Sequence, residues 1–120
     1  MEGLGSRGDV RPGTVPYGTT KSAVRYLARA LARETRDTPV KVSAISPGMV
    51  RTDLLLDSMA PERADRGARI IDVLADDVAT AAPWVVDTVL ANTRSGQRIA
   101  RLTAPKVAWR FASSSLQRED

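Results

Sequence analysis

The chain has 120 residues, enough for one domain with a modest core. It contains neither Cys nor His, which excludes disulfides, thiolate nucleophiles, histidine-based triads and Cys- or His-ligated metal sites within these residues. The net charge is +4, but basic and acidic residues are interleaved, so we expect a solvated surface and no nucleic-acid partner. No apolar run reaches the ~18 residues of a membrane span, and no signal-peptide pattern is present. The sequence therefore predicts a soluble, cytoplasmic protein.

Residues 1–16 are predicted to form a loop, because Gly and Pro are frequent there and no helical or strand periodicity appears. Gly3, Gly5 and Gly8 match the G-x-G-x-x-G spacing of dinucleotide-binding turns. However, no strand precedes these glycines, and Pro12 and Gly13 follow where a helix would have to begin. We interpret the match as accidental and expect the glycines to let the loop pass close to a substrate.

A long helix is predicted from about Pro16 to the segment 35–39, where a proline ends it. Its apolar stripe should pack on a sheet and on another subunit. The stripe consists of Ala23, Tyr26, Leu27, Ala30 and Leu31, and Val24, Ala28 and Ala32 extend the small or apolar surface further round the helix.

Tyr17 and Lys21 are four residues apart near the start of this helix, so their side chains should lie on one face. An ammonium group beside a phenol favours the phenolate, and Lys21 is therefore expected to lower the pKa of Tyr17 towards neutrality. By itself the spacing also occurs by coincidence in many helices, with the Tyr half-buried and the Lys solvated.

The rest of the chain alternates between short strands and helices. Because ligands of open α/β sheets bind beyond the carboxyl ends of strands, Pro47 and Gly48 occupy a position where a ligand is expected. The predicted elements are a strand over 40–45 closed by Ser46-Pro47-Gly48, a helix from about Pro61 to Leu74, a helix capped by Asp76 or Asp77 and kinked or delayed by Pro83, a strand over 97–102, and a final helix after Thr103.

Together, Tyr17 to Lys21, the strand ending in Ser46-Pro47-Gly48, and Val50 and Thr52 resemble the short-chain dehydrogenase/reductase family, most closely its chlorophyll(ide) b reductase-like branch. The resemblance implies an α/β fold: the C-terminal part of a Rossmann-like, doubly wound parallel sheet, incomplete, spanning 1–112 with a polar tail over 113–120. The family's Gly-rich phosphate loop and catalytic Asn belong to its first half. We therefore expect a fragment, from a truncated reading frame or a start at an internal Met.

The resemblance also implies an NAD(P)-dependent oxidoreductase acting on a carbonyl or alcohol, with NAD or NADP left open and a homo-oligomer as the full-length state. Tyr17 would be the general acid/base and Lys21 would hold the ribose. The implied sites are catalytic Tyr17, Lys21 and Ser6, cofactor-binding Tyr17, Lys21, Pro47, Gly48, Val50 and Thr52, and no metal.

Two points stay open at this stage. Ser6 would orient the substrate oxygen, but many family members carry that Ser two residues earlier, where this chain has Leu4. An ordinary turn serine is the alternative for Ser6. For the whole chain, the alternative is an inactive interaction or dimerisation module that binds no nucleotide.

Overall fold

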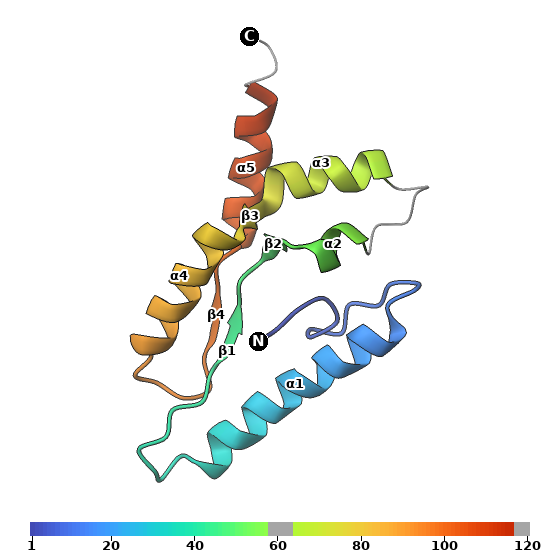
Figure 1. The fold of residues 1–120 in the computed structure, drawn as a ribbon. Helices are drawn as coiled ribbons and strands as arrows, with labels where there is room; N and C mark the ends of the chain where they lie inside the picture. The colour runs from blue at the N-terminus through green and yellow to red at the C-terminus, as the bar shows by residue number, and fades with distance from the viewer. Residues whose placement is uncertain (58–63, 117–120) are drawn as a thin grey trace. The chain divides into compact units, whose positions relative to one another are not determined.

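The computed structural model describes residues 1–57 and 64–116. Its internal contacts divide the chain into two compact units, Met1–Ser46 with Val85–Ala100, and Pro47–Trp84 with Arg101–Asp120. Helices alternate with short strands along the chain (Figure 1). Both sheets are parallel pairs. This confirms the predicted α/β class and the incomplete, Rossmann-like parallel arrangement.

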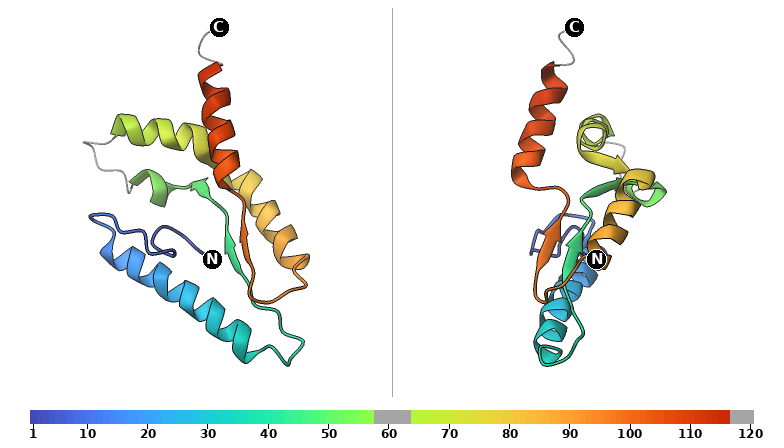
Figure 2. Two further views of the ribbon diagram at one scale, coloured as in Figure 1. Left: turned by 180° about the vertical axis from the view of Figure 1, so that it is seen from behind. Right: turned by 90° about the vertical axis from the view of Figure 1, so that its left-hand side faces the viewer.

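The first unit combines one long helix with a two-stranded sheet. Helix α1 covers Val15–Glu34, and strand β1 (Ala44–Ser46) pairs in parallel with β4 (Arg98–Ala100). The two strands run side by side in every view (Figures 1 and 2). The backbone N–H of Glu2 donates to the carbonyl of Ile45 at 2.7 Å, and the buried Glu2 carboxylate pairs with Arg98 at 2.5 Å. The N-terminal residues are thus attached to this sheet.

The face that α1 presents to the rest of its unit agrees in part with the predicted one. Its partly buried positions include Gly18, Lys21, Arg25, Ala28 and Ala32. In contrast, Tyr26, Leu27 and Leu31 of the predicted stripe are 77%, 55% and 36% exposed. The helical period was therefore predicted correctly, and the small residues Ala28 and Ala32 of the predicted surface are partly buried, whereas its largest apolar side chains are exposed here.

The second unit holds the other parallel pair, β2 (Met49–Arg51) with β3 (Ala75–Asp77). Its helices are α2 (Asp53–Asp57), α3 (Ala64–Leu74) and α5 (Ala104–Leu116), and α3 ends against α5 (Figure 2). Helix α4 (Val78–Leu90) crosses the boundary between the units. Among the described residues, the buried hydrophobic side chains are Ile71, Leu74 and Ala81, so the apolar core is small.

Several predicted boundaries agree with the structure. Helix α1 ends at Glu34 with Thr35 as its C-cap, and α5 starts directly after Thr103. Strands β1 and β4 form at the predicted places but are shorter, because the parallel ladder covers three residues on each side. The predicted helix start near Pro61 lies outside the described residues.

Other details differ from the sequence prediction. Strands β2 and β3 were not predicted, and Asp76 and Asp77, expected as helix caps, belong to β3. Pro83 lies inside α4, so it does not delay the helix start. Helix α5 continues to Leu116, into the segment predicted as a polar tail. Strand β3, with the sequence Ala-Asp-Asp, lacks the propensity signal on which sequence prediction depends.

A charged cluster on β3 joins the parts of the second unit. The carboxylate of Asp76 accepts from Arg101 Nε and Arg110 Nη2, both at 2.7 Å, and Arg110 Nη1 donates to the carbonyl of Leu74 at 2.9 Å. The Arg101 guanidinium lies 5.5 Å from the ring centre of Trp84. Because 14% of the Asp76 side chain is exposed, these bonds replace most of its hydration. The cluster ties β3 and the end of α3 to α5.

Burial raises the pKa of Asp76, but the hydrogen bonds and charges of Arg101 and Arg110 outweigh burial and hold that pKa below its ordinary value of 3.8. The folded protein therefore binds this proton less readily than the unfolded chain does. The stabilisation from Asp76 is complete above pH 3.8 and is lost as the pH falls through the lowered pKa of the folded state.

We predict that the free energy of unfolding, measured with urea, falls as the pH is lowered below 3.8, and that Asp76→Asn weakens this dependence. Asp37→Asn is the matched control, because Asp37 pairs with Arg36 at the surface where both side chains are largely exposed. An unchanged pH dependence in Asp76→Asn would contradict the assignment.

Candidate active site

Tyr17 and Lys21 form a stacked pair one helical turn apart, as their spacing predicts. The Lys21 Nζ atom lies 5.4 Å from the centre of the Tyr17 ring. Tyr17 is 42% exposed, so its hydroxyl is not enclosed in an apolar core. Lys21 Nζ donates to the carbonyl of Met1 across 3.4 Å, and an ammonium group has two further donors. The pair therefore offers a phenol and a cation to one ligand.

The loop before α1 packs directly on this pair. A Cβ atom placed on Gly3 would lie 2.5 Å from the Tyr17 hydroxyl oxygen and 3.2 Å from Lys21 Cε. At Gly5, whose φ is +90°, a Cβ atom would lie 2.6 Å from Gly18 Cα. The Ser22 hydroxyl donates to the carbonyl of Gly5 at 2.8 Å. These glycines were expected to bring a loop close to substrate, and in the structure they bring it close to the helix.

The G-x-G-x-x-G match belongs to this loop and does not open a helix. The N–H of Ser6 donates to Gly3 and that of Gly8 to Gly5, which makes two successive turns. The first helix begins only at Val15. Nothing in the local sequence distinguishes Ser22 from other surface serines, and its contact with Gly5 could not be predicted.

Ser6 lies in the first of these turns. It is 3% exposed, and its Oγ accepts the backbone N–H of Gly3 at 2.9 Å. This bond uses a lone pair of the hydroxyl oxygen, and the hydroxyl proton can still be donated. Tyr17, Lys21 and Ser6 are thus brought together through Gly3, which contacts all three.

The remaining predicted residues belong to the second unit and are described within it. Pro47 is buried. Gly48 has φ of +81°, and a Cβ atom there would lie 2.9 Å from Leu102 Cβ. Val50 lies in β2 opposite Asp76 of β3. The Thr52 hydroxyl accepts the N–H of Leu55 at 3.3 Å, which is the contact of a helix N-cap for α2.

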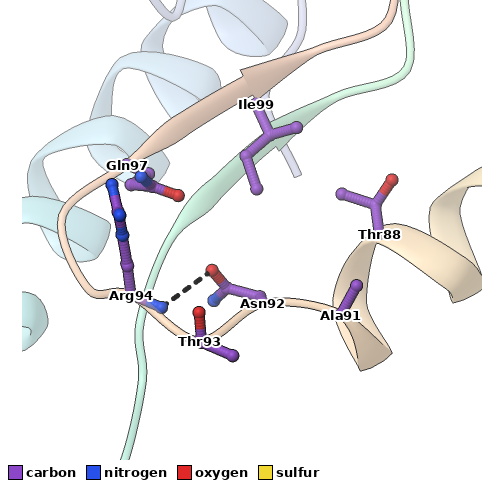
Figure 3. A pocket seen from close by; sticks show the side chains of 7 residues that line it. All are labelled: Thr88, Ala91, Asn92, Thr93, Arg94, Gln97 and Ile99. Atoms are coloured by element: carbon purple, nitrogen blue, oxygen red, sulfur yellow. Dashed lines mark hydrogen bonds between the residues drawn. The ribbon is translucent and has the colours of Figure 1, made fainter.

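A separate cavity of about 340 Å³ lies in the first unit, between the end of α4 and the start of β4 (Figure 3). Its side chains are mostly polar, and the backbone N–H of Arg94 donates to Asn92 Oδ1 at 3.4 Å. Tyr17, Lys21 and Ser6 do not line it, so it is distinct from the candidate active site. The lining residues are Thr88, Ala91, Asn92, Thr93, Arg94, Gln97 and Ile99.

Residues 1–57 and 64–116 contain neither a metal-binding cluster of side chains nor a membrane-spanning helix. No group of three or more acidic side chains is placed to hold a metal ion. No helix in this part of the chain combines the length and apolar character needed to cross a membrane.

Residues 6–63 match the family model described as short chain dehydrogenase. Over 118 residues the chain is 32% identical to a probable chlorophyll(ide) b reductase, chloroplastic, of Oryza sativa, covering 98% of this chain and 23% of the relative. A chloroplastic chlorophyll(ide) b reductase of Arabidopsis thaliana is 35% identical over 99 residues, covering 80% of this chain and 28% of the relative. Glucose 1-dehydrogenase 2 of Bacillus subtilis is 31% identical over 80 residues, covering 63% of this chain and 31% of the relative.

The chain belongs to the short-chain dehydrogenase/reductase family, as the motifs around Tyr17, Lys21 and Gly48 predicted. It spans about a quarter of the length of the chlorophyll(ide) b reductases that it matches. No solved structure matches the chain.

The predicted cytoplasmic location is contradicted by these relatives. The chlorophyll(ide) b reductases of Oryza sativa and Arabidopsis thaliana are chloroplastic. Composition and the lack of an apolar run carry no information on which compartment of a cell holds a protein, and the prediction had no stronger basis.

Gly48 provides a test of the turn that follows β1. We predict that Gly48→Ala lowers the free energy of unfolding, because the left-handed backbone costs an L-residue about 1–2 kcal/mol and because the new methyl group would press on Leu102. Gly96→Ala is the matched control: Gly96 has φ of +77°, and its Cβ atom would meet no atom within 4 Å. Chemical denaturation should show a larger loss for Gly48→Ala, and equal losses would rule out the Leu102 contact.

Proposed function

We propose that this chain carries the proton-transfer residues of an NAD(P)-dependent oxidoreductase that interconverts a carbonyl and an alcohol. The observation that carries the proposal is the stacked pair of Tyr17 and Lys21, in which Tyr17 is 42% exposed and the ammonium lies 5.4 Å from the ring centre. Family membership supports the reaction class. The hydroxyl of Tyr17 donates a proton to the carbonyl oxygen in reduction and accepts one from the alcohol in oxidation.

Lys21 is proposed to bind the cofactor. Its remaining N–H groups would donate to hydroxyl groups of the nicotinamide-bearing ribose. The contact with the Met1 carbonyl, at 3.4 Å, is long for a hydrogen bond and can be exchanged for a ligand oxygen. Lys21 is thus held over the ring without losing its capacity to bind.

The residues after β1 are proposed to contact the nicotinamide. Pro47 and Gly48 directly follow β1, at the carboxyl end of a parallel strand, where ligands of open α/β sheets bind. Val50 offers an apolar surface, and Thr52 keeps a hydroxyl proton while its oxygen caps α2. When bound, the nicotinamide supplies the hydride. These residues fit such a group, and none of them distinguishes NAD from NADP.

The substrate is proposed only at the level of a carbonyl or alcohol. The names of the relatives include a reductase of chlorophyll(ide) b, a glucose dehydrogenase and a 3beta-hydroxysteroid dehydrogenase. Compounds that differ this much in size do not select one substrate for this chain.

Self-association of the full-length protein is also proposed. Leu27 and Leu31 on α1 are partly to largely exposed, one turn apart and on the same side of the helix. A second copy of the chain would remove this apolar surface from water.

We predict that the 120 residues alone bind neither NADH nor NADPH measurably. Pyrophosphate is normally bound by a glycine-rich turn at a helix N-terminus, and in the described parts of the chain no such turn joins a strand to a helix. Fluorescence titration with both nucleotides tests this, and micromolar binding would contradict it. Failure of the complete enzyme to bind either nucleotide would instead favour the inactive interaction module.

In the complete enzyme, Tyr17→Phe should reduce turnover by about 10²–10⁴-fold, the usual contribution of general acid/base catalysis, and leave cofactor affinity nearly unchanged. Lys21→Ala should weaken both. Tyr26→Phe is the matched control, because it removes the same hydroxyl from an exposed position of the same helix. The measurements are single-turnover rates and cofactor dissociation constants. Near wild-type turnover in Tyr17→Phe would show that Tyr17 is not the acid.

A further inference from the structure

Both polar backbone groups of Gly3, its N–H and its carbonyl, are hydrogen-bonded to Ser6. Its N–H donates to Ser6 Oγ at 2.9 Å, and its carbonyl accepts the N–H of Ser6 at 3.1 Å. Ser6 itself is 3% exposed. A buried serine that closes a turn in this way holds the Gly3 backbone in one orientation.

The backbone conformation of Gly3 does not require a glycine, but the space that a side chain would occupy is filled by Tyr17 and Lys21. Gly3 is not among the glycines with positive φ, so an L-residue could adopt its backbone conformation. A Cβ atom there would meet the Tyr17 hydroxyl oxygen at 2.5 Å and the Lys21 side chain at 3.2 and 3.3 Å. The Cα of Gly3 therefore forms the surface against which the phenol and the lysine chain rest.

The loop cannot easily move away from α1 to relieve such a contact. On one side of Gly3, the Met1 carbonyl accepts from Lys21. On the other side, Gly5 approaches Gly18 closely and accepts a hydrogen bond from Ser22. Next to Met1, Glu2 is bonded to Ile45 and paired with Arg98. Gly3 is thus fixed from both directions along the chain.

We propose that Gly3 is a positioning residue for the Tyr17 hydroxyl and the Lys21 chain, and that Ser6 acts through Gly3 without touching substrate. This inference rests on the proposed function, because it concerns where the phenol stands relative to the reacting oxygen. Displacement of a catalytic group by about 1 Å can reduce turnover about 10²-fold, so a single methyl group at residue 3 is enough to affect catalysis.

The contact itself is tested without any enzymatic assay, by a double-mutant cycle on stability in the complete protein. Gly3→Ala should lower the denaturation midpoint, and adding Tyr17→Phe should recover part of that loss, because it removes the oxygen that the new methyl group meets. Additive effects of the two substitutions would overturn the contact. If Gly3→Ala alone does not fold, recovery of folding in Gly3→Ala/Tyr17→Phe supports it.

The proposed effect of Gly3 on catalysis is tested by measuring turnover in the complete enzyme. Gly3→Ala should reduce kcat by about 10²-fold and leave KM for the carbonyl substrate nearly unchanged. Gly8→Ala is the control, because a Cβ atom at Gly8 meets nothing within 4 Å. It carries a left-handed backbone penalty, so equal loss of kcat in both variants would overturn a specific role for Gly3.

The role of Ser6 is tested by combining Ser6→Ala with Gly3→Ala. If Ser6 acts through Gly3, the kcat loss from Ser6→Ala should shrink when Gly3→Ala is already present, and KM should again change little. Full additivity, or a rise in KM from Ser6→Ala alone, would indicate direct contact with substrate and overturn the inference. The two substitutions could also be coupled in stability in a protein that shows no NAD(P)-dependent turnover. In that case the contact between Gly3 and Tyr17 exists, but it has no role in catalysis, and the proposed function is refuted.

Discussion

The close approach of the N-terminal loop to α1 is the constraint on which the first unit depends. Two glycines make it possible, because a Cβ atom on Gly3 would collide with Tyr17 and one on Gly5 would collide with Gly18. Short contacts of this kind exclude water and leave little freedom for the groups involved. The Tyr17 and Lys21 side chains are held in this way by backbone, whose position varies less than that of a long side chain.

In the second unit, ion pairs hold the helices and strands together, whereas in the first unit the loop and α1 are in close backbone contact. Its described apolar core is limited to Ile71, Leu74 and Ala81, while Asp76 binds two arginines at 2.7 Å. Arg51 of β2 adds a pair with Asp77, which lies opposite it in the parallel ladder. Partly buried ion pairs of this geometry bring elements into register even where they contribute little net stability. Three-residue strands can therefore pair in a unit with few buried apolar side chains.

Large apolar side chains are exposed on both α1 and α4, with Tyr26 at 77% and Leu90 at 80%. Apolar periodicity locates a helix and its apolar surface, but it does not say which part of that surface a neighbour covers. The small residues of the predicted surface on α1 are partly buried and its largest apolar side chains are exposed, a division that depends on tertiary packing.

The sequence alone determined the class of the protein and its candidate chemistry. The four-residue spacing of Tyr17 and Lys21 was enough to predict that their side chains lie together, because helical periodicity is a local property. The end of α1 and the start of α5 followed from local signals in the segment 35–39 and at Thr103. The order of these motifs along the chain was enough to indicate the family, which the relatives confirm.

Only the tertiary structure decided which residues surround the Tyr17–Lys21 pair and which strands pair. Gly3 and Ser22 carry no local signal of their contacts, since each contact joins segments more than ten residues apart. Strand β3 has the sequence Ala-Asp-Asp, which no propensity would assign to a sheet, and the arginines on Asp76 come from residues that follow it by 25 and 34 positions. Contacts between distant segments depend on the folded arrangement as a whole, whereas helix periodicity and caps depend on a few adjacent residues.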